Sequence, residues 1–327
     1  MRSPSMLSRR SFVAAGATLL PFASARAQSP AMAKILVGFP PGGGSDVIAR
    51  AVADQIRGNY AGTVLVDNKP GAAARIAAEA VKAAAPDGQT MLLTPAAVLT
   101  LYPHVYKELR YDPFKDFTPV TAVSSTQLAM FAGPAVPQKV TTVPELVQWL
   151  KANPKLGTFG SPALGSAPHL TGLMFGKLAG VELLPVAYQG AAPATLALLA
   201  GEVALSFGSI SDGIEYVRSG KLRLLATTGE KRSLHVPTAP TFAETGFPDL
   251  VIEDWHSILL PAKAPAAVVA RLHEAVRKAV ATPPVQSTLN RFAFEPLANS
   301  PEDFARILRT EHERWARIVR TLKFSME

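Results

Sequence analysis

The stretch Phe39-Pro40-Pro41-Gly42-Gly43-Gly44-Ser45-Asp46 decides the fold, because it joins an apolar run at 34–37 to a segment with helical spacing at 46–57. Two prolines followed by three glycines predict a turn, so the chain passes from strand to helix here. Glycines let backbone N–H groups approach a ligand closely, and the N-terminus of the following helix favours anions. An ordinary strand–helix turn in which Ser45 or Asp46 caps the helix explains the stretch equally well.

The segments that follow continue the alternation of strand and helix. Apolar runs at 64–66 and 91–94 are typical of strands, and residues 76–84 have helical spacing. This order predicts the start of a doubly wound parallel sheet, in which ligands bind at the carboxyl ends of the strands. A second unit of the same kind predicts helices at 143–152, 169–179, 193–200 and 214–219 and strands at 157–160, 184–188, 203–207 and 222–227.

Two further helices are expected near the C-terminus, at 266–281 and 301–322, and they need a partner to cover their apolar sides. The first of two lobes would be this partner, if the lobes are joined by extended crossing segments near 128–134 and 252–261. The expected organisation is lobe 1 at 28–130 and 255–327, and lobe 2 at 131–254. The predicted fold class is therefore α/β, with two lobes and a ligand cleft between them.

The first 27 residues have the three parts of a secretory signal. Arg2, Arg9 and Arg10 form a positive region, residues 12–22 are apolar, and Ala25-Arg26-Ala27 matches a cleavage site. We expect cleavage after Ala27 and a periplasmic protein. The segment Ser8-Arg9-Arg10-Ser11-Phe12-Val13 resembles a twin-arginine signal, so the Sec and twin-arginine routes both remain open.

Composition excludes several classes of function. Without the four arginines of the signal, 29 basic residues face 25 acidic ones in a chain of 327, and no basic run suggests nucleic-acid binding. The absence of cysteine excludes thiolate metal sites and a cysteine nucleophile. The six histidines show no metal-binding spacing. No cofactor motif occurs either, so no metal or cofactor is expected.

A hydrolase on an α/β fold needs the G-x-S-x-G turn that presents a nucleophilic serine. The segment Gly208-Ser209-Ile210-Ser211-Asp212 does not supply it, and the chain contains no other catalytic constellation. We therefore expect a binding protein and no catalytic residues. A periplasmic α/β hydrolase remains as a less favoured alternative.

Several motifs in order give the chain a specific resemblance to a known family. They are the Phe-Pro-Pro-Gly-Gly turn, Val66-Asp67-Asn68-Lys69-Pro70-Gly71, Ala85-Pro86-Asp87-Gly88, Tyr188-Gln189-Gly190, Leu199-Ala200-Gly201-Glu202-Val203 and Pro240-Thr241-Phe242-Ala243-Glu244-Thr245-Gly246. The sequence resembles the TctC/Bug family, the periplasmic receptors of tripartite tricarboxylate transporters, from about residue 34 to the C-terminal helix. The resemblance implies a type II periplasmic-binding-protein fold and a monomer that captures a small carboxylate. Its partner would be the transporter's membrane components or, alternatively, a membrane sensor kinase.

The resemblance also implies that two loops, 40–46 and 161–166, grip the carboxylate, one from each lobe. The predicted ligand-binding residues are Phe39, Pro41, Gly42, Gly43, Asp46, Thr94, Ser161, Gly165, Ser166, His169, Tyr188, Gln189 and Ser209. Helix capping is an equal alternative for Ser161 and for Ser166, and a structural role is the favoured alternative for His169.

Two departures from the family pattern bear on ligand preference. Ala72-Ala73-Ala74-Arg75 replaces a glycine-rich stretch, so Arg75 either pairs with a distal carboxylate or, as we prefer, faces solvent. Pro162-Ala163-Leu164 makes the second loop stiffer and less polar. The identity of the carboxylate stays open among dicarboxylates, tricarboxylates, acidic amino acids and aromatic acids.

Overall fold

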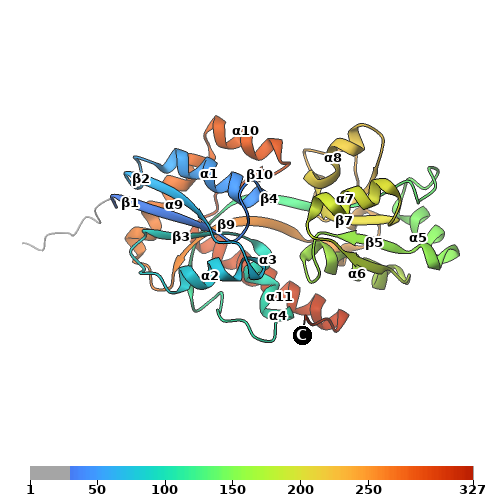
Figure 1. Cartoon of the computed structure of the whole chain (residues 1–327), viewed down its shortest axis with the longest axis horizontal. Helices are drawn as coiled ribbons and strands as arrows, with labels where there is room; N and C mark the ends of the chain where they lie inside the picture. Colours follow the sequence, from blue (N-terminus) through green and yellow to red (C-terminus); the bar gives the residue numbers. More distant parts are fainter. Residues whose placement is uncertain (1–29, 327) are drawn as a thin grey trace, which may run out of the picture.

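The computed structural model describes residues 30–326, which form two α/β lobes connected by two strands (Figure 1). The connecting strands are β4 (Phe117–Ala132) and β9 (Glu253–Pro261). Strand β4 pairs with β9 up to Gln127, and from Leu128 onward it pairs with strands of the second lobe. The partner of β4 thus changes between two successive residues, which marks the crossing.

The first lobe has strand order β2-β1-β3-β9-β4. Strands β1 (Met32–Val37), β2 (Thr63–Asn68) and β3 (Thr90–Pro95) are parallel, as the sequence predicts. Strand β9 runs antiparallel to β3 and β4, and the short β10 (Glu295–Pro296) pairs with β4.

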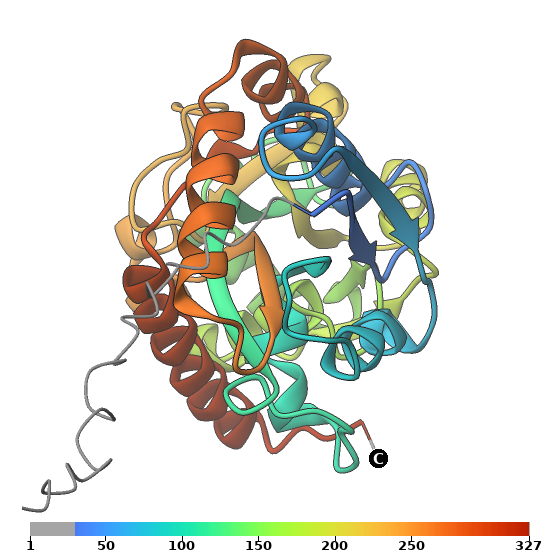
Figure 2. The same ribbon diagram turned by 90° about the vertical axis from the view of Figure 1, so that its left-hand side faces the viewer.

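Helices cover both faces of this sheet, as the view from the first lobe shows (Figure 2). Ile35 and Val37 of β1 pack in one buried cluster and Leu36 in the other, because side chains alternate across a strand. One face carries α1 (Gly44–Ile56), α9 (Ala266–Val280) and α10 (Pro283–Arg291). The other face carries α2 (Arg75–Lys82), α3 (Ala96–Thr100), α4 (Tyr102–Val105) and α11 (Pro301–Leu322).

The second lobe has strand order β4-β7-β5-β6, with β8 also paired to β4. Its strands are β5 (Thr158–Ser161), β6 (Leu184–Ala187), β7 (Leu205–Ser209) and β8 (Arg223–Thr227). Its helices are α5 (Val143–Ala152), α6 (Ala167–Ala179), α7 (Ala191–Ala200) and α8 (Ile210–Arg218). Each predicted element of this unit occurs, and α8 begins four residues before the predicted start.

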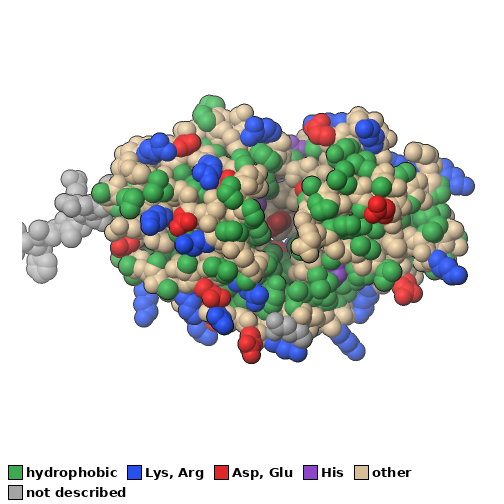
Figure 3. Space-filling view, viewed as in Figure 1, with side chains coloured by type: hydrophobic (Ala, Val, Ile, Leu, Met, Phe, Trp, Pro, Cys, Tyr) green, Lys and Arg blue, Asp and Glu red, His purple; other side chains and the backbone are tan. Residues whose placement is uncertain are grey.

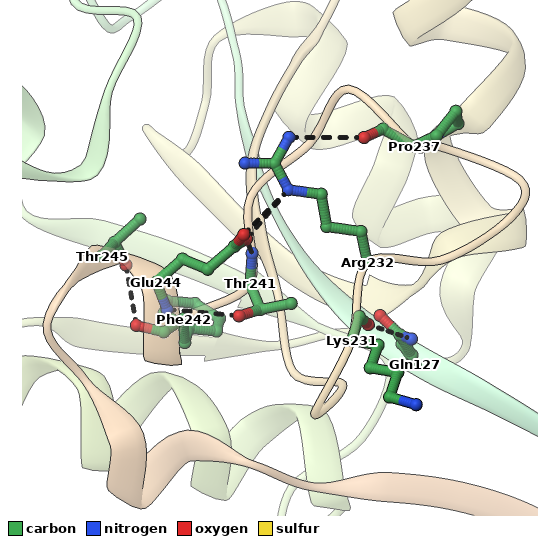
Figure 4. Close-up of polar contacts among 8 residues, drawn as sticks. All are labelled: Gln127, Lys231, Arg232, Pro237, Thr241, Phe242, Glu244 and Thr245. Carbon is green, nitrogen blue, oxygen red and sulfur yellow. Dashed lines mark hydrogen bonds and ion pairs between the residues drawn. The ribbon is translucent and has the colours of Figure 1, made fainter.

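A long loop after β8 returns the chain to β9, and polar contacts fix it (Figure 4). The Arg232 guanidinium bonds both carboxylate oxygens of Glu244 at 3.0 Å, and Glu244 also accepts the Thr241 backbone N–H. Gln127 Nε2 donates to the Lys231 carbonyl at 2.9 Å, so the loop is held to β4 beside the crossing.

The C-terminal helix α11 lies along the first lobe and reaches the second, as Figure 1 shows. Its apolar side buries Phe304, Leu308 and Trp315, while Lys177 of α6 donates to the Thr321 carbonyl at 2.6 Å. The tail therefore packs mainly against α3, α4 and β4, and its assignment to lobe 1 stays a prediction.

Several structural features are missing from the sequence prediction, among them the short elements α3, α4 and β10. Strand β4 is one strand of 16 residues rather than a short crossing segment, and α10 follows α9 after two residues. The lobe boundaries at 130/131 and 254/255 stay predictions, although the change of β4 partner lies close to the first.

The predicted signal at 1–27 lies outside the described residues. Within residues 30–326, no helix combines the length and apolarity needed to cross a bilayer.

Candidate functional site

A cavity of about 970 Å³ lies between the two lobes. In the space-filling view a hollow separates the lobes, and apolar side chains surround it (Figure 3). The first lobe contributes Phe39, Pro40, Pro41, Gly42, Gly43, Gly44, Ser45, Pro95, His256, Phe292 and Phe294. The second lobe contributes Pro162, Gly190, Ala191, Ala192, Thr195, Leu196, Ser209, Ser211, Asp212 and Tyr216.

The turn at 39–45 is fixed by a buried carboxylate behind it. Asp46 accepts the Gly42 N–H at 2.9 Å and the Asn68 side-chain N–H at 3.0 Å, and it pairs with Arg50 at 2.9 Å. Asn68 also donates to the Phe39 carbonyl at 3.0 Å. Burial opposes ionisation of Asp46, but the hydrogen bonds from Arg50, Gly42 and Asn68 outweigh it and lower the pKa. Asp46, a predicted ligand-binding residue, therefore holds the turn from outside the cavity lining.

The N-terminus of α1 opens into the cavity without a side-chain cap. The first N–H groups of a helix have no partner within the helix, so here they are available to an anion. Gly42 has a left-handed φ of +88°, which favours glycine. Gly43 has φ −77° and ψ 168°, an extended conformation open to any residue, so its value here is close backbone approach and not a special φ.

Ser45 and His256 form a hydrogen bond at the cavity wall, with 2.9 Å between Ser45 Oγ and His256 Nε2. His256 lies on β9, and burial lowers its pKa to about 4, so the imidazole is neutral at pH 7. His256 Nδ1 is buried and has no hydrogen-bond partner in the described part of the chain. A buried N–H without a partner is rarer than a buried acceptor without one, which favours the tautomer in which Nε2–H donates to Ser45. The Ser45 hydroxyl then remains free to donate to a ligand.

A second helix N-terminus faces the cavity from the other lobe. Helix α7 follows Gly190, whose φ is +116°, and has no side-chain cap. Gly190, Ala191 and Ala192 all line the cavity, and the Gly190 N–H donates to the Pro162 carbonyl at 2.9 Å. The sequence prediction selected Tyr188 and Gln189, directly before this turn, but not Gly190, Ala191 or Ala192, which line the cavity.

The predicted loop 161–166 contributes only Pro162 to the cavity lining. Ser166 caps α6 by accepting the His169 N–H at 3.3 Å, and its hydroxyl donates to the Ala163 carbonyl at 2.7 Å. His169 Nδ1 accepts the Gly165 N–H at 3.3 Å, and burial lowers the pKa of His169 to about 4. These contacts support the capping and structural alternatives for Ser166 and His169.

Of the remaining predicted residues, some line the cavity and others do not. Ser209 lines the cavity. Tyr188 and Gln189 precede the α7 turn and do not line the cavity. Thr94 and Ser161 are buried, and within residues 30–326 neither hydroxyl has a hydrogen-bond partner. The ligand-binding role of the predicted set therefore stays a prediction.

Arg75 lies outside the cavity lining. Its guanidinium carbon lies 4.0 Å from the centre of the Tyr106 ring, and Nε donates to the Ala72 carbonyl at 2.9 Å. Those contacts give the half-buried Arg75 a local role: it neither lines the cavity nor simply faces solvent, as the preferred alternative had it.

No lysine or arginine occurs among the cavity-lining residues of the described chain, and Asp212 is the one acidic residue there. No group of histidine, aspartate and glutamate in residues 30–326 has the geometry of a metal site. The cavity thus offers an anion helix ends and hydroxyl groups instead of a cationic side chain.

The comparisons with known proteins show the family of this chain and its fold. The profile described as "Tripartite tricarboxylate transporter family receptor", TctC, matches residues 48–324. This chain belongs to the TctC family. BugT of Bordetella pertussis is 32% identical over 292 residues, which cover 88% of either chain. The TctC family consists of periplasmic solute-binding receptors.

Two solved structures related to this TctC-family chain have bound ligands. R. palustris Rpa4515 with adipate is 29% identical, with a TM-score of 0.79, over 90% of this chain and 98% of that one. MatC from Rhodopseudomonas palustris with bound malate is 25% identical, with a TM-score of 0.75, over 88% and 98% of the two chains. The resemblance to the TctC/Bug family and the expected fold class are confirmed.

Proposed function

We propose that this protein binds a small carboxylate in the cavity between its lobes and delivers it to the membrane components of a tripartite transporter. The observation that carries the proposal is the pair of uncapped helix N-termini, of α1 and α7, on opposite walls of one cavity. Backbone N–H groups at helix ends stabilise anions, and the effect is stronger where water is excluded. The adipate and malate bound by two relatives support a carboxylate ligand.

Closure of the lobes follows from the same arrangement. A ligand that contacts both helix ends does so best when the lobes approach each other, so binding favours the closed form. The crossing at Gln127 and Leu128 of β4 is the expected hinge, because there the strand changes partner from one lobe to the other. The proposed lobes are 28–130 with 255–327, and 131–254.

The test is calorimetric titration of the chain without residues 1–27 with carboxylates and with the corresponding neutral amides. We expect the acids to bind and the amides to bind at least tenfold more weakly, since only the acids carry the charge that the helix ends stabilise. Gly43→Val adds a branched side chain at the cavity wall and should reduce the affinity more than tenfold. Ala270→Val, on the exposed side of α9, is the control and should leave it unchanged. Equal affinity for acids and amides would contradict the proposal.

A further inference from the structure

Asp212 is the feature of the cavity that capture of an anion does not explain. It lies in the first turn of α8 and lines the cavity together with Ser209 and Ser211. One carboxylate oxygen, Oδ2, accepts the Ser209 N–H at 2.8 Å. This contact makes Asp212 the acidic member of a capping box at the start of α8, and Oδ1 takes no part in it while the residue lines the cavity.

The carboxylate of Asp212 is held firmly in place. A Cβ at Gly208 would lie 2.5 Å from Asp212 Oδ2, so only glycine at that position leaves room for the carboxylate against the backbone of β7. The Asp212 carbonyl accepts the Thr195 hydroxyl at 3.2 Å, which fastens the first turn of α8 to α7. Asp212 therefore cannot turn away from the cavity without breaking these contacts.

The charge of Asp212 has no cationic partner. Residues 30–326 show no ion pair to it, and no lysine or arginine lines the cavity with it. Burial raises the pKa of Asp212 to about 6, against the opposing effect of the Ser209 N–H, so the group is largely ionised at pH 7. Burying the ionised carboxylate of Asp212 costs free energy. A ligand that brings a positive charge would offset this cost, and a ligand carboxylate beside Asp212 would increase it.

The rest of the lining describes the body of the ligand. Phe39, Phe292, Phe294, Leu196 and Tyr216 give the cavity large apolar walls on both lobes. These walls favour a ligand whose body is apolar and whose only polar groups are the charged ones.

We infer that the preferred ligand is an amino acid or other amino carboxylate with one carboxylate, one ammonium group and an apolar body. This inference rests on the proposed function: the carboxylate meets the helix ends of α1 and α7, and the ammonium group meets Asp212. Asp212 is then the residue that selects against a second carboxylate.

Matched ligands test this assignment, because they differ in one group alone. One set is hexanoate, 6-aminohexanoate and adipate, and the other is 3-phenylpropanoate, phenylalanine and benzylmalonate. In at least one set, we expect the amino compound to bind the wild-type protein at least tenfold more tightly than the other two. Asp212→Asn keeps an acceptor for the Ser209 N–H but removes the charge, so it should abolish this preference and raise the affinity for the diacid.

Glu215→Gln, on the exposed side of the same helix, is the matched control and should keep the wild-type preference. If Asp212→Asn does not fold, Asp212→Ser tests the same loss of charge. A diacid that binds the wild type most tightly, or a preference for the amino compound that survives removal of the charge, would overturn the inference and leave the proposed function intact. No binding by any of the six acids would overturn the inference, and the titration with carboxylates and amides described above then tests the proposed function separately.

Discussion

The hydroxyl oxygen of Ser45 lies 2.9 Å from Nε2 of His256, and this hydrogen bond joins the first turn of α1 to the strand β9 that crosses between the lobes. The contact places a hydroxyl and an imidazole at one wall of the cavity, beside the uncapped helix end. His256 also packs edge-to-face on Phe294, with 5.3 Å between ring centres. The anion-binding end of α1 is therefore coupled directly to a crossing strand.

The buried state of His256 predicts a specific dependence of stability on pH. Its pKa in the folded protein is about 4, below the ordinary value of 6.5, so the stability present above pH 6.5 is lost as the pH falls toward 4. Burial raises the pKa of Asp254 to about 6, and this group changes stability in the opposite sense. A comparison with His256→Gln isolates the histidine.

Between pH 7.5 and pH 5, the free energy of unfolding of His256→Gln should fall by about 2 kcal/mol less than that of the wild type. Urea unfolding at the two pH values measures the difference. An equal fall in both proteins would show that His256 takes up its proton in the folded state without cost.

The two neighbouring glycines of the α1 turn should respond differently to alanine. Gly42 has φ +88°, so Gly42→Ala should cost about 1 kcal/mol of stability. Gly43 has φ −77°, and its nearest neighbour to an added Cβ is the Pro40 carbonyl oxygen at 3.7 Å. Gly43→Ala should therefore leave the stability within about 0.5 kcal/mol. Thermal unfolding of both variants measures the two losses of stability. Equal losses would contradict the backbone geometry described.

Three successive alanines before α2 have left-handed backbone, with φ of 46°, 53° and 71° at Ala72, Ala73 and Ala74. A left-handed conformation costs a residue with a Cβ roughly 1 kcal/mol. Ala73→Gly should therefore stabilise the protein by about that amount. Ala270→Gly, at an exposed position inside α9, is the control and should destabilise it by a similar amount. Denaturant unfolding of the two variants should give shifts of opposite sign.

Arg75→Ala separates the two roles considered for this residue. The guanidinium stacks on Tyr106 and bonds the Ala72 carbonyl, so we expect a loss of about 1 kcal/mol in stability. The affinity for monoacids and diacids should change less than twofold. A selective loss of diacid binding in calorimetry would instead assign Arg75 to a distal carboxylate.

Glu311 predicts a stabilising substitution far from the cavity. Burial raises its pKa to about 7, and the pairing with Arg314 at 3.1 Å only partly opposes this. Ionisation therefore costs stability as the pH rises through 4.5 to 7, and Glu311→Gln should raise the free energy of unfolding by about 1–2 kcal/mol at pH 8. At pH 5 the gain should disappear. Loss of stability at pH 8 would show that the ion pair with Arg314 outweighs the cost of burial.

Much of the fold could be predicted from local patterns. The helices 143–152 and 301–322 match α5 and α11 at both ends, because a Thr142 cap and a Ser300 cap with following prolines define where they begin. The length of β4 could not be predicted. Its residues after Gln127 are specified by pairing with β7 and β8, which are distant in sequence.

The candidate site was more predictable on the first lobe than on the second, where Ser209 is the one predicted ligand-binding residue in the described lining. The turn at Gly42 and Gly43 carries its own signal in the sequence, and it lines the cavity. On the second lobe, the loops before α6 and α7 are equally plausible from sequence, since both precede helices. Only the tertiary arrangement shows that Gly190 faces the cavity while Ser166 satisfies its own helix.

A crystal structure of the protein with a bound carboxylate tests the central claim most directly. We predict that the carboxylate lies within hydrogen-bonding distance, directly or through one water, of the N–H groups at the start of α1 and of α7, with the lobes closer together than in the free protein. A carboxylate held instead by an arginine outside this cavity, with the helix ends of α1 and α7 free, would contradict the account.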